Sequence, residues 1–407
     1  MSEKTEFRMT ANRVLVALIL TAMFAAGAGR AETQTTKQSG SAARISPGTP
    51  QPSRPVDHYR RTRDWEQVQE YMGEETFYNR TVGRWLHKPE NRTKSWQDGE
   101  KELGIQRPDA DKAYASALDV MTADPTDDLG FLAIQFCMKF TEKEEPLNHC
   151  SEQALTYLDQ YYISDPRMKD ITLSLARAAG ARGEAILDKV IASSTDRELR
   201  AAAAWWLVEE KHNEVDDATL PDAQRSVRRE KMIRLAHLLQ EQFGDVNVWS
   251  GKPAREEIAP MLFSLEHLAL GDVIPDMQVQ RVDGKKDDLN NYRGKVVLLD
   301  YWATWCIPCV HSLKEHVAPL KNELAGKPFE VITLSIDDNA GKVDEFTKSV
   351  MPLPFVNWHI GMNSPYYYPW GLAGVPHYYL IDKNGVIRAN TFEAETLLET
   401  ARKLATQ

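Results

Sequence analysis

Apolar residues in the first two-thirds of the chain recur every three or four positions, the spacing that buries one face of a helix. This spacing predicts helices at 110–122, 127–140, 150–162, 168–179, 183–193, 196–210 and 221–243. Short polar residues precede two of these segments, at Asp127-Asp128 and Thr195-Asp196, and such residues cap the first turn of a helix. We therefore expect an all-α domain of stacked, solenoid-like helical hairpins at 57–268.

The pattern changes after residue 268, where short β-rich runs alternate with helical stretches. Strands are predicted at 295–301, 330–336, 354–358, 377–381 and 386–390. Helices are predicted at 310–324, 340–350 and 394–405. Strands that alternate with helices indicate an α/β layer, so we expect a second domain of this class at 269–407.

The beginning of the chain has the features of a targeting segment. Lys4, Arg8 and Arg13 precede an apolar run at 14–28, and small residues follow this run. The run has 15 residues, fewer than the roughly 20 that a spanning helix needs. The pattern predicts a signal peptide at 1–31, with an uncleaved signal anchor as the alternative. Either interpretation places the rest of the chain outside the cytosol, in the periplasm or secreted, and cleavage of the signal peptide leaves no membrane span in the mature chain.

Residues 32–56 are rich in Ser, Thr, Gln, Gly and Pro and contain few apolar side chains. Burial of such a segment cannot offset the entropy lost on ordering. We expect a flexible linker here.

Composition excludes several classes of protein. The 407 residues carry a formal net charge of −10, whereas a nucleic-acid-binding protein usually has a basic face. The mean hydropathy of −0.47 excludes a multi-span membrane protein. Four cysteines in a chain of this length are too few for a disulfide-stapled scaffold. A globular protein remains, and its function has to come from local motifs.

The candidate chemistry lies in a pair of cysteines that follow a predicted strand. The strand runs into Cys306-Ile307-Pro308-Cys309 at the predicted start of a helix. A C-x-x-C motif in this setting is typical of a thioredoxin-like redox pair. The unpaired N–H groups of the first helical turn favour an anion, so the pKa of the Cys306 thiol should fall from ~8.5 towards ~7. Cys306 is then the attacking thiolate, and Cys309 is close enough to resolve a mixed disulfide.

Two signatures resemble the TlpA/ResA-like extracytoplasmic thiol–disulfide oxidoreductases of bacteria. The first combines Tyr292-Arg293-Gly294-Lys295 with Trp302-Ala303-Thr304-Trp305 and the cysteine motif. The second extends from Leu372 to Gly385 and contains Val375-Pro376. The resemblance covers the chain from about residue 270 and implies a thioredoxin-like fold for 269–407. The helical part shares no such signature.

The resemblance also implies roles for particular residues. Val375-Pro376 should form a cis peptide that faces the cysteines, and the Val375 backbone should pair with a substrate strand. Trp305 and Pro308 complete the expected substrate-binding set. Asp300 occupies the place of a buried carboxylate, which would take the proton of the resolving thiol, and a hydrogen-bonded or solvated strand Asp is the alternative.

We expect a protein-disulfide reductase that needs no cofactor and no metal. Its partners would be disulfide-bearing protein substrates and a membrane thiol-relay protein that supplies electrons. The Ile307-Pro308 dipeptide lacks the histidine found in strongly oxidising relatives, which favours a reductant. His311 and His377 depart from the family pattern, and we expect both to be exposed rather than to tune the cysteines.

Outside this motif, Cys137 and Cys150 lie at the facing ends of two predicted helices. A structural disulfide and a pair of buried free thiols are both open, and a zinc site with His149 would lack ligands. Trp205-Trp206 is expected in the core, and the aromatic cluster 366–370 in the core or at the groove edge.

Two other functions remain open. A thiol peroxidase of the redoxin group needs a Pro-x-x-x-Thr-x-x-Cys loop, but Thr304 is two residues from Cys306 rather than three and the proline is missing. An adaptor would use the helical domain to bind a partner and the second domain as a passive platform. The intact cysteine pair argues against a passive role.

Overall fold

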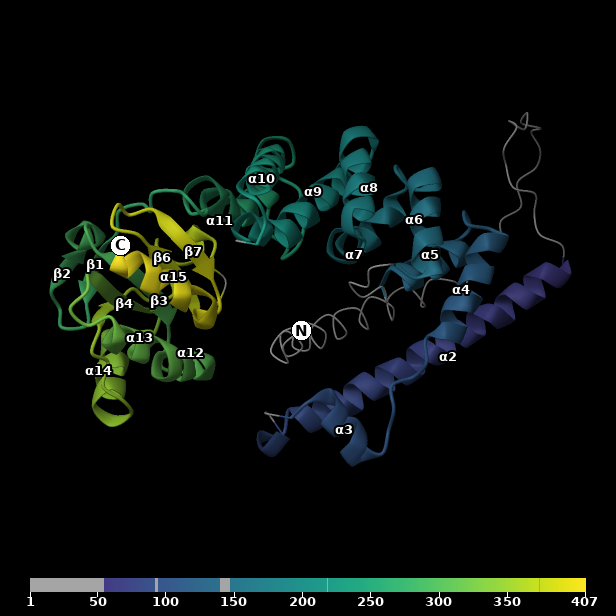
Figure 1. Ribbon diagram of the computed structural model, residues 1–407. Helices are drawn as coiled ribbons and strands as arrows, with labels where there is room; N and C mark the ends of the chain where they lie inside the picture. The colour runs from purple at the N-terminus through teal and green to yellow at the C-terminus, as the bar shows by residue number, and fades with distance from the viewer. Residues whose placement is uncertain (1–54, 92–93, 140–146, 218, 373) are drawn as a thin grey trace. The chain divides into compact units, whose positions relative to one another are not determined.

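The computed structural model describes residues 55–91, 94–139, 147–217, 219–372 and 374–407. The predicted signal peptide lies outside the described residues, as does the predicted linker apart from its last two residues, which begin the helix Pro55–Leu86. The described part has a helical N-terminal region and a C-terminal thioredoxin-like α/β domain, so the predicted fold class is confirmed (Figure 1).

The chain forms two compact units, with the division between Tyr161 and Tyr162. In the first unit the described helices are α2 (Pro55–Leu86), η1 (Pro89–Asn91), α3 (Trp96–Leu103), α4 (Asp111–Ala123), α5 (Asp128–Lys139) and α6 (His149–Tyr161). Helix α5 packs against α4 and α6, and α2 packs against α3 and α4. The contacts bury side chains such as Val82, Met121 and Leu158. A bidentate ion pair between Arg61 and Asp127 ties α2 to the start of α5.

Helices also form the first part of the second unit. They are η2 (Pro166–Ile171), α7 (Thr172–Ala178), α8 (Gly180–Ser193), α9 (Arg197–Lys211), η3 (His212–Asp216), α10 (Asp222–Gln242) and α11 (Ala254–His267). Asp196 caps α9 as predicted, because its side chain accepts hydrogen bonds from the N–H groups of Glu198 and Leu199. Consecutive helices from α7 to α11 pack together and bury Leu187, Leu207 and other apolar side chains.

The remainder of the second unit contains one mixed sheet. Its strands are β1 (Gln278–Arg281), β2 (Lys286–Asp288), β3 (Val296–Trp302), β4 (Phe329–Ser335), β5 (Val356–His359), β6 (His377–Ile381) and β7 (Ile387–Thr391), in the spatial order β2-β1-β5-β4-β3-β6-β7. Strands β3, β4 and β5 are parallel, and β6 runs antiparallel to β3. Every residue of β3 is buried, which agrees with its central place in the sheet.

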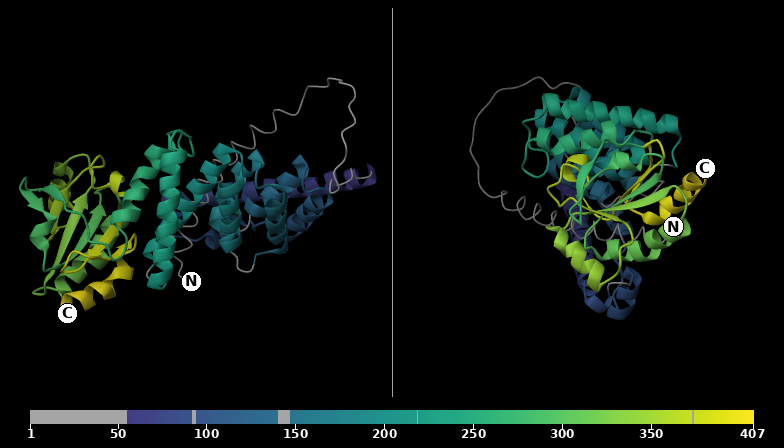
Figure 2. Two further views of the ribbon diagram at one scale, coloured as in Figure 1. Left: turned by 90° about the horizontal axis from the view of Figure 1, so that it is seen from above. Right: turned by 90° about the vertical axis from the view of Figure 1, so that its left-hand side faces the viewer.

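Helical segments cover the sheet (Figure 2). They are α12 (Ile307–Ser312), the π-helical turn η5 (Leu313–Val317), α13 (Ala318–Glu323), α14 (Ala340–Ser349) and α15 (Ala394–Thr406), with the short 3-10 helices η4 (Leu289–Tyr292) and η6 (Tyr368–Trp370) in loops. Helix α15 packs on β3 and β6 beside η5. Strand β3 and helix α12 both contribute buried side chains to the core around the sheet.

The helical part of the second unit also packs against the α/β part. Phe263 of α11 stacks on Trp370 of η6, with ring centroids 6.3 Å apart. Arg229 of α10 forms an ion pair with Asp272 at 2.6 Å, just before the first strand. The change from helices to strands follows His267, whereas the division between compact units lies about a hundred residues earlier, because α10 and α11 pack on the α/β part.

Among the described residues, no helix combines the length and the apolar character that crossing a bilayer requires.

Candidate active site

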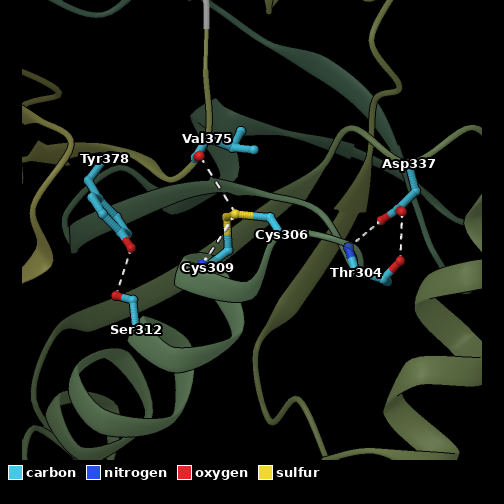
Figure 3. The surroundings of a disulfide bond; sticks show 7 residues. All are labelled: Thr304, Cys306, Cys309, Ser312, Asp337, Val375 and Tyr378. Carbon is cyan, nitrogen blue, oxygen red and sulfur yellow. Dashed lines mark hydrogen bonds between the residues drawn. A yellow bond between two sulfur atoms is a disulfide. The ribbon is translucent and has the colours of Figure 1, made fainter. Parts of the chain in front are cut away.

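The two cysteines of the motif lie at the start of α12 and form a disulfide, with Sγ atoms 2.03 Å apart (Figure 3). Cys306 is the N-cap of the helix, and its Sγ accepts the backbone N–H of Cys309 at 3.2 Å. In the reduced state the same N–H and the first turn of the helix would stabilise a thiolate at Cys306. Both residues are buried, but Cys306 is 6% exposed and Cys309 only 1%, so Cys306 is the more accessible residue of the pair.

The peptide bond between Val375 and Pro376 is cis, as the resemblance implies. The carbonyl oxygen of Val375 lies 3.6 Å from Sγ of Cys306, which brings the two signatures together although they are 69 positions apart in the chain (Figure 3). Val375 and Pro376 are half-buried. A substrate backbone that approached Cys306 would therefore meet the Val375 peptide group.

Exposed side chains accompany the cysteine pair along the chain. Trp305 is 58% exposed and Ile307 71%, and Pro308 is exposed as well. Exposed apolar side chains of this size are unfavourable in water, and the free energy falls when a binding partner covers them. The expected substrate-binding residues Trp305 and Pro308 are thus accessible next to the disulfide.

Asp300 is fully buried in the centre of β3, opposite Tyr378 of β6. Within the described part of the chain, neither carboxyl oxygen has a hydrogen-bond partner. Burial raises the pKa of the Asp300 carboxyl well above its ordinary value. The hydroxyl of neighbouring Tyr378 instead donates to Oγ of Ser312 on α12, at 2.7 Å. The structure thus buries Asp300 without a hydrogen bond from any described protein group, which contradicts the alternative of an exposed or protein-bonded Asp, and its role as a base stays a prediction.

Asp337 is a site residue that the sequence analysis missed. It follows β4, is fully buried, and accepts hydrogen bonds from the N–H and the hydroxyl of Thr304, at 3.0 and 2.7 Å (Figure 3). The hydroxyl of Ser335 donates to the same carboxylate at 2.8 Å. These bonds hold the turn that leads from β3 to Cys306. An Asp directly after a predicted parallel strand was the available signal, because such residues lie at the edge where ligands bind.

The two histidines behave differently. His311 is exposed, as expected. The expectation for His377 was wrong, because this side chain is only 5% exposed, and its Nε2 lies 2.7 Å from Oδ1 of Asn390. The first residue of β6 is covered by aromatic rings, including Tyr301 and Tyr379, which an inspection of the local sequence does not reveal.

The remaining clusters are structural. Cys137 and Cys150 form a disulfide, with Cα atoms 5.7 Å apart, so the free-thiol and zinc alternatives are wrong. Trp205 is buried, as expected, whereas Trp206 is half-buried and packs against the exposed Trp249. In the cluster 366–370, Tyr367 and Trp370 are buried in the core, whereas Tyr368 is 51% exposed.

Comparisons with known proteins found relatives of the C-terminal part of the chain. Residues 269–404 match the Redoxin family model. The chain is 32% identical over 127 residues to the thiol-disulfide oxidoreductase ResA of Bacillus thuringiensis subsp. konkukian (strain 97-27), covering 30% of this chain and 69% of that protein. It is 29% identical over 126 residues to ResA of Geobacillus thermodenitrificans (strain NG80-2), covering 30% of this chain and 68% of that protein.

Among solved structures, a putative thiol:disulfide interchange protein DsbE from Chlorobium tepidum is 27% identical, with a TM-score of 0.30 over 34% of this chain and 98% of that chain. The ResA relatives and the Redoxin match both lie in the part of the chain that carries the cysteine pair. Through its C-terminal domain, this chain belongs to the ResA-like family of thiol–disulfide oxidoreductases.

Proposed function

We propose that the protein reduces disulfides of protein substrates outside the cytoplasm, with Cys306 as the nucleophile and Cys309 as the resolving thiol. The observation that carries the proposal is the placement of Cys306 Sγ at the start of α12, where it accepts the Cys309 N–H and lies beside the Val375 carbonyl. A reactive thiolate, an accessible sulfur and a peptide group for the substrate backbone then meet at one point.

The chemistry proceeds in two exchanges. The Cys306 thiolate attacks one sulfur of the substrate disulfide, forms a mixed disulfide and releases the other substrate sulfur as a thiolate. Cys309 then loses its proton and attacks Sγ of Cys306, so that the second substrate sulfur leaves. The substrate gains two electrons, and the enzyme ends with the Cys306–Cys309 disulfide seen in the structure.

Asp300, in its ionised form, would accept the Cys309 proton in the second exchange. A carboxyl group whose pKa is raised by burial is a stronger base when ionised than an ordinary aspartate. Two electrons must then be returned to the cysteine pair, and a membrane thiol-relay protein is the proposed donor. Location outside the cytoplasm rests on the apolar run at 14–28, and a structural disulfide such as Cys137–Cys150 is typical of oxidising compartments.

Trapping provides the decisive experiment. Cys309→Ala protein, expressed in whole cells, should accumulate mixed disulfides through Cys306, and these should disappear on reduction. Cys306→Ala is the matched control and should trap none. Purified wild-type protein should also catalyse the reduction of insulin by dithiothreitol and should not consume peroxide. Absence of trapped species and of insulin reduction would refute the proposal, and peroxide consumption would favour the peroxidase alternative.

A further inference from the structure

A chain of hydrogen bonds joins the helical part of the second unit to the strand that follows the cis-proline. Asp216, the last residue of η3, accepts the Leu270 N–H at Oδ1 (2.8 Å) and the Asn390 amide at Oδ2 (2.6 Å). Asn390 lies on β7, and its Oδ1 is 2.7 Å from Nε2 of His377, the first residue of β6. Asp216 and Asn390 are 174 positions apart, so only the fold brings them together.

The chemistry of the three groups dictates where the protons are. An ionised carboxylate only accepts hydrogen bonds, so Asn390 must present its NH₂ group to Asp216. Its carbonyl oxygen then faces His377 and can only accept, which requires a proton on Nε2 of the imidazole. We propose that Asp216, acting through Asn390, fixes the tautomer and the orientation of His377 and is thereby a positioning residue for the redox site.

His377 is well placed to transmit this constraint. It directly follows Pro376, and the carbonyl of Val375 on the other side of that proline lies 3.6 Å from Cys306 Sγ. The centroid of the imidazole ring lies 5.0 Å from that of Tyr379 and 4.6 Å from that of Phe392. Rotation of the imidazole would therefore disturb the packing at the start of β6. The consequence for catalysis rests on the proposed disulfide reduction, whereas the tautomer does not.

Among the described residues, the titratable groups that interact with the Asp216 carboxylate include His212 of η3, Arg229 of α10 and Tyr379 of β6, besides the two hydrogen-bond donors. Arg229 is already paired with Asp272. Loss of hydration raises the pKa of Asp216 to about 6, so the carboxylate is ionised and purely accepting at pH 8.

Replacement of Asp216 by asparagine should reverse the direction of the hydrogen bonds that run from Asp216 through Asn390 to His377. The Leu270 N–H still needs an acceptor, so the amide introduced by Asp216→Asn turns its oxygen to Leu270 and its NH₂ group to Asn390. Asn390 then flips, presents its own NH₂ group to His377, and the imidazole has to carry its proton on Nδ1. Nitrogen-15 NMR of histidine-labelled protein at pH 8 distinguishes the two tautomers, and His377→Gln assigns the signal among the 10 histidines.

A compensating change provides the rescue. In Asp216→Asn/Asn390→Asp the carboxylate moves from position 216 to position 390. There it accepts hydrogen bonds from the side chains at positions 216 and 377, which restores the proton on Nε2 of His377. We expect Asp216→Asn to lower kcat/KM for insulin reduction roughly 2- to 30-fold, and the double variant to recover most of it. Asp217→Asn is the matched control, because the Asp217 side chain bonds only to Thr219 among the contacts described, and this change should alter neither readout.

The wild-type protein alone already tests the assignment, since a bare Nε2 on His377 at pH 8 would overturn it without any variant. An unchanged tautomer in Asp216→Asn would overturn the coupling through Asn390. A switched tautomer with unaltered kinetics would overturn the positioning role. Wild-type protein that fails to reduce insulin but shows the predicted tautomers would refute the proposed function and leave the hydrogen-bond chain standing.

Discussion

Replacement of Asp300 by asparagine tests how the buried carboxyl of β3 behaves. The side chain is fully buried, its oxygens lack hydrogen-bond partners in the described part of the chain, and burial raises its pKa. In the unfolded chain an aspartate ionises near pH ~3.9. Above that pH the unfolded carboxyl loses its proton while the folded one keeps it, so wild-type stability should fall as pH rises. The slope is about 1.4 kcal/mol per pH unit up to the raised folded pKa.

Asp300→Asn keeps the shape and removes the ionisation. Its free energy of unfolding should match that of the wild type near pH 4 and exceed it progressively at higher pH, by about 1.4 kcal/mol for each unit within the window. Urea unfolding followed by tryptophan fluorescence, at several pH values with both disulfides intact, measures this difference. Asp338→Asn is the control, because Asp338 is exposed and its pKa is lowered, chiefly by its hydrogen bond with Lys342.

The same variant tests the proton transfer. If Asp300 accepts the Cys309 proton, Asp300→Asn should slow insulin reduction by about 10² without abolishing it. A stability difference that does not change between pH 4 and pH 7 would refute the raised pKa of the buried carboxyl. Wild-type turnover across the pH range would refute the role as a base, even if the stability result held.

Three further changes test other parts of the structure. Asp337→Ala removes the acceptor of three hydrogen bonds to Thr304 and Ser335 and should cost ~1–3 kcal/mol in urea unfolding, whereas Asp338→Ala should cost little. Gly371→Ala places a Cβ 3.1 Å from the Pro260 carbonyl oxygen at φ 78° and should lower the melting temperature, unlike Gly73→Ala, where the Cβ meets open space. Cys137→Ser/Cys150→Ser opens a loop with a sequence separation of 13 and should lower the free energy of unfolding of the first unit by about 3 kcal/mol. Insulin reduction by the Cys306–Cys309 pair should continue in this variant, and loss of that activity would show that the two disulfides are coupled.

Local sequence patterns predicted much of the fold, although the helices α2, α3 and α11 were not predicted individually. The helices α4 to α10 and the strands β3 to β7 were predicted because their apolar spacing is set by neighbours within a few residues. Strands β1 and β2 were missed, since Gln278–Arg281 and Lys286–Asp288 are largely polar. They lie together at one edge of the sheet, where pairing of backbone groups supplies the stability that side-chain burial supplies elsewhere.

The redox motif was equally accessible to sequence reasoning. Cys306 and Cys309 are three residues apart, and their chemistry depends on the helix start that they themselves occupy. The pairing of Cys137 with Cys150 was left open, because a spacing of 13 residues is compatible with bonded and unbonded thiols, and only the packing of α5 against α6 brings the two sulfur atoms together.

Burial and hydrogen-bond partners between distant segments had to come from the folded molecule. His377 was expected at the surface, but rings from β3, β6 and the segment after β7 enclose it. The position of Asp337 after a strand did not reveal that its carboxylate bonds Thr304, and nothing in the local sequence of Asp216 indicated that its carboxylate bonds Asn390. The physical reason is that desolvation and hydrogen bonding depend on which groups are adjacent in space, and for these residues the adjacent groups are 33 and 174 positions away.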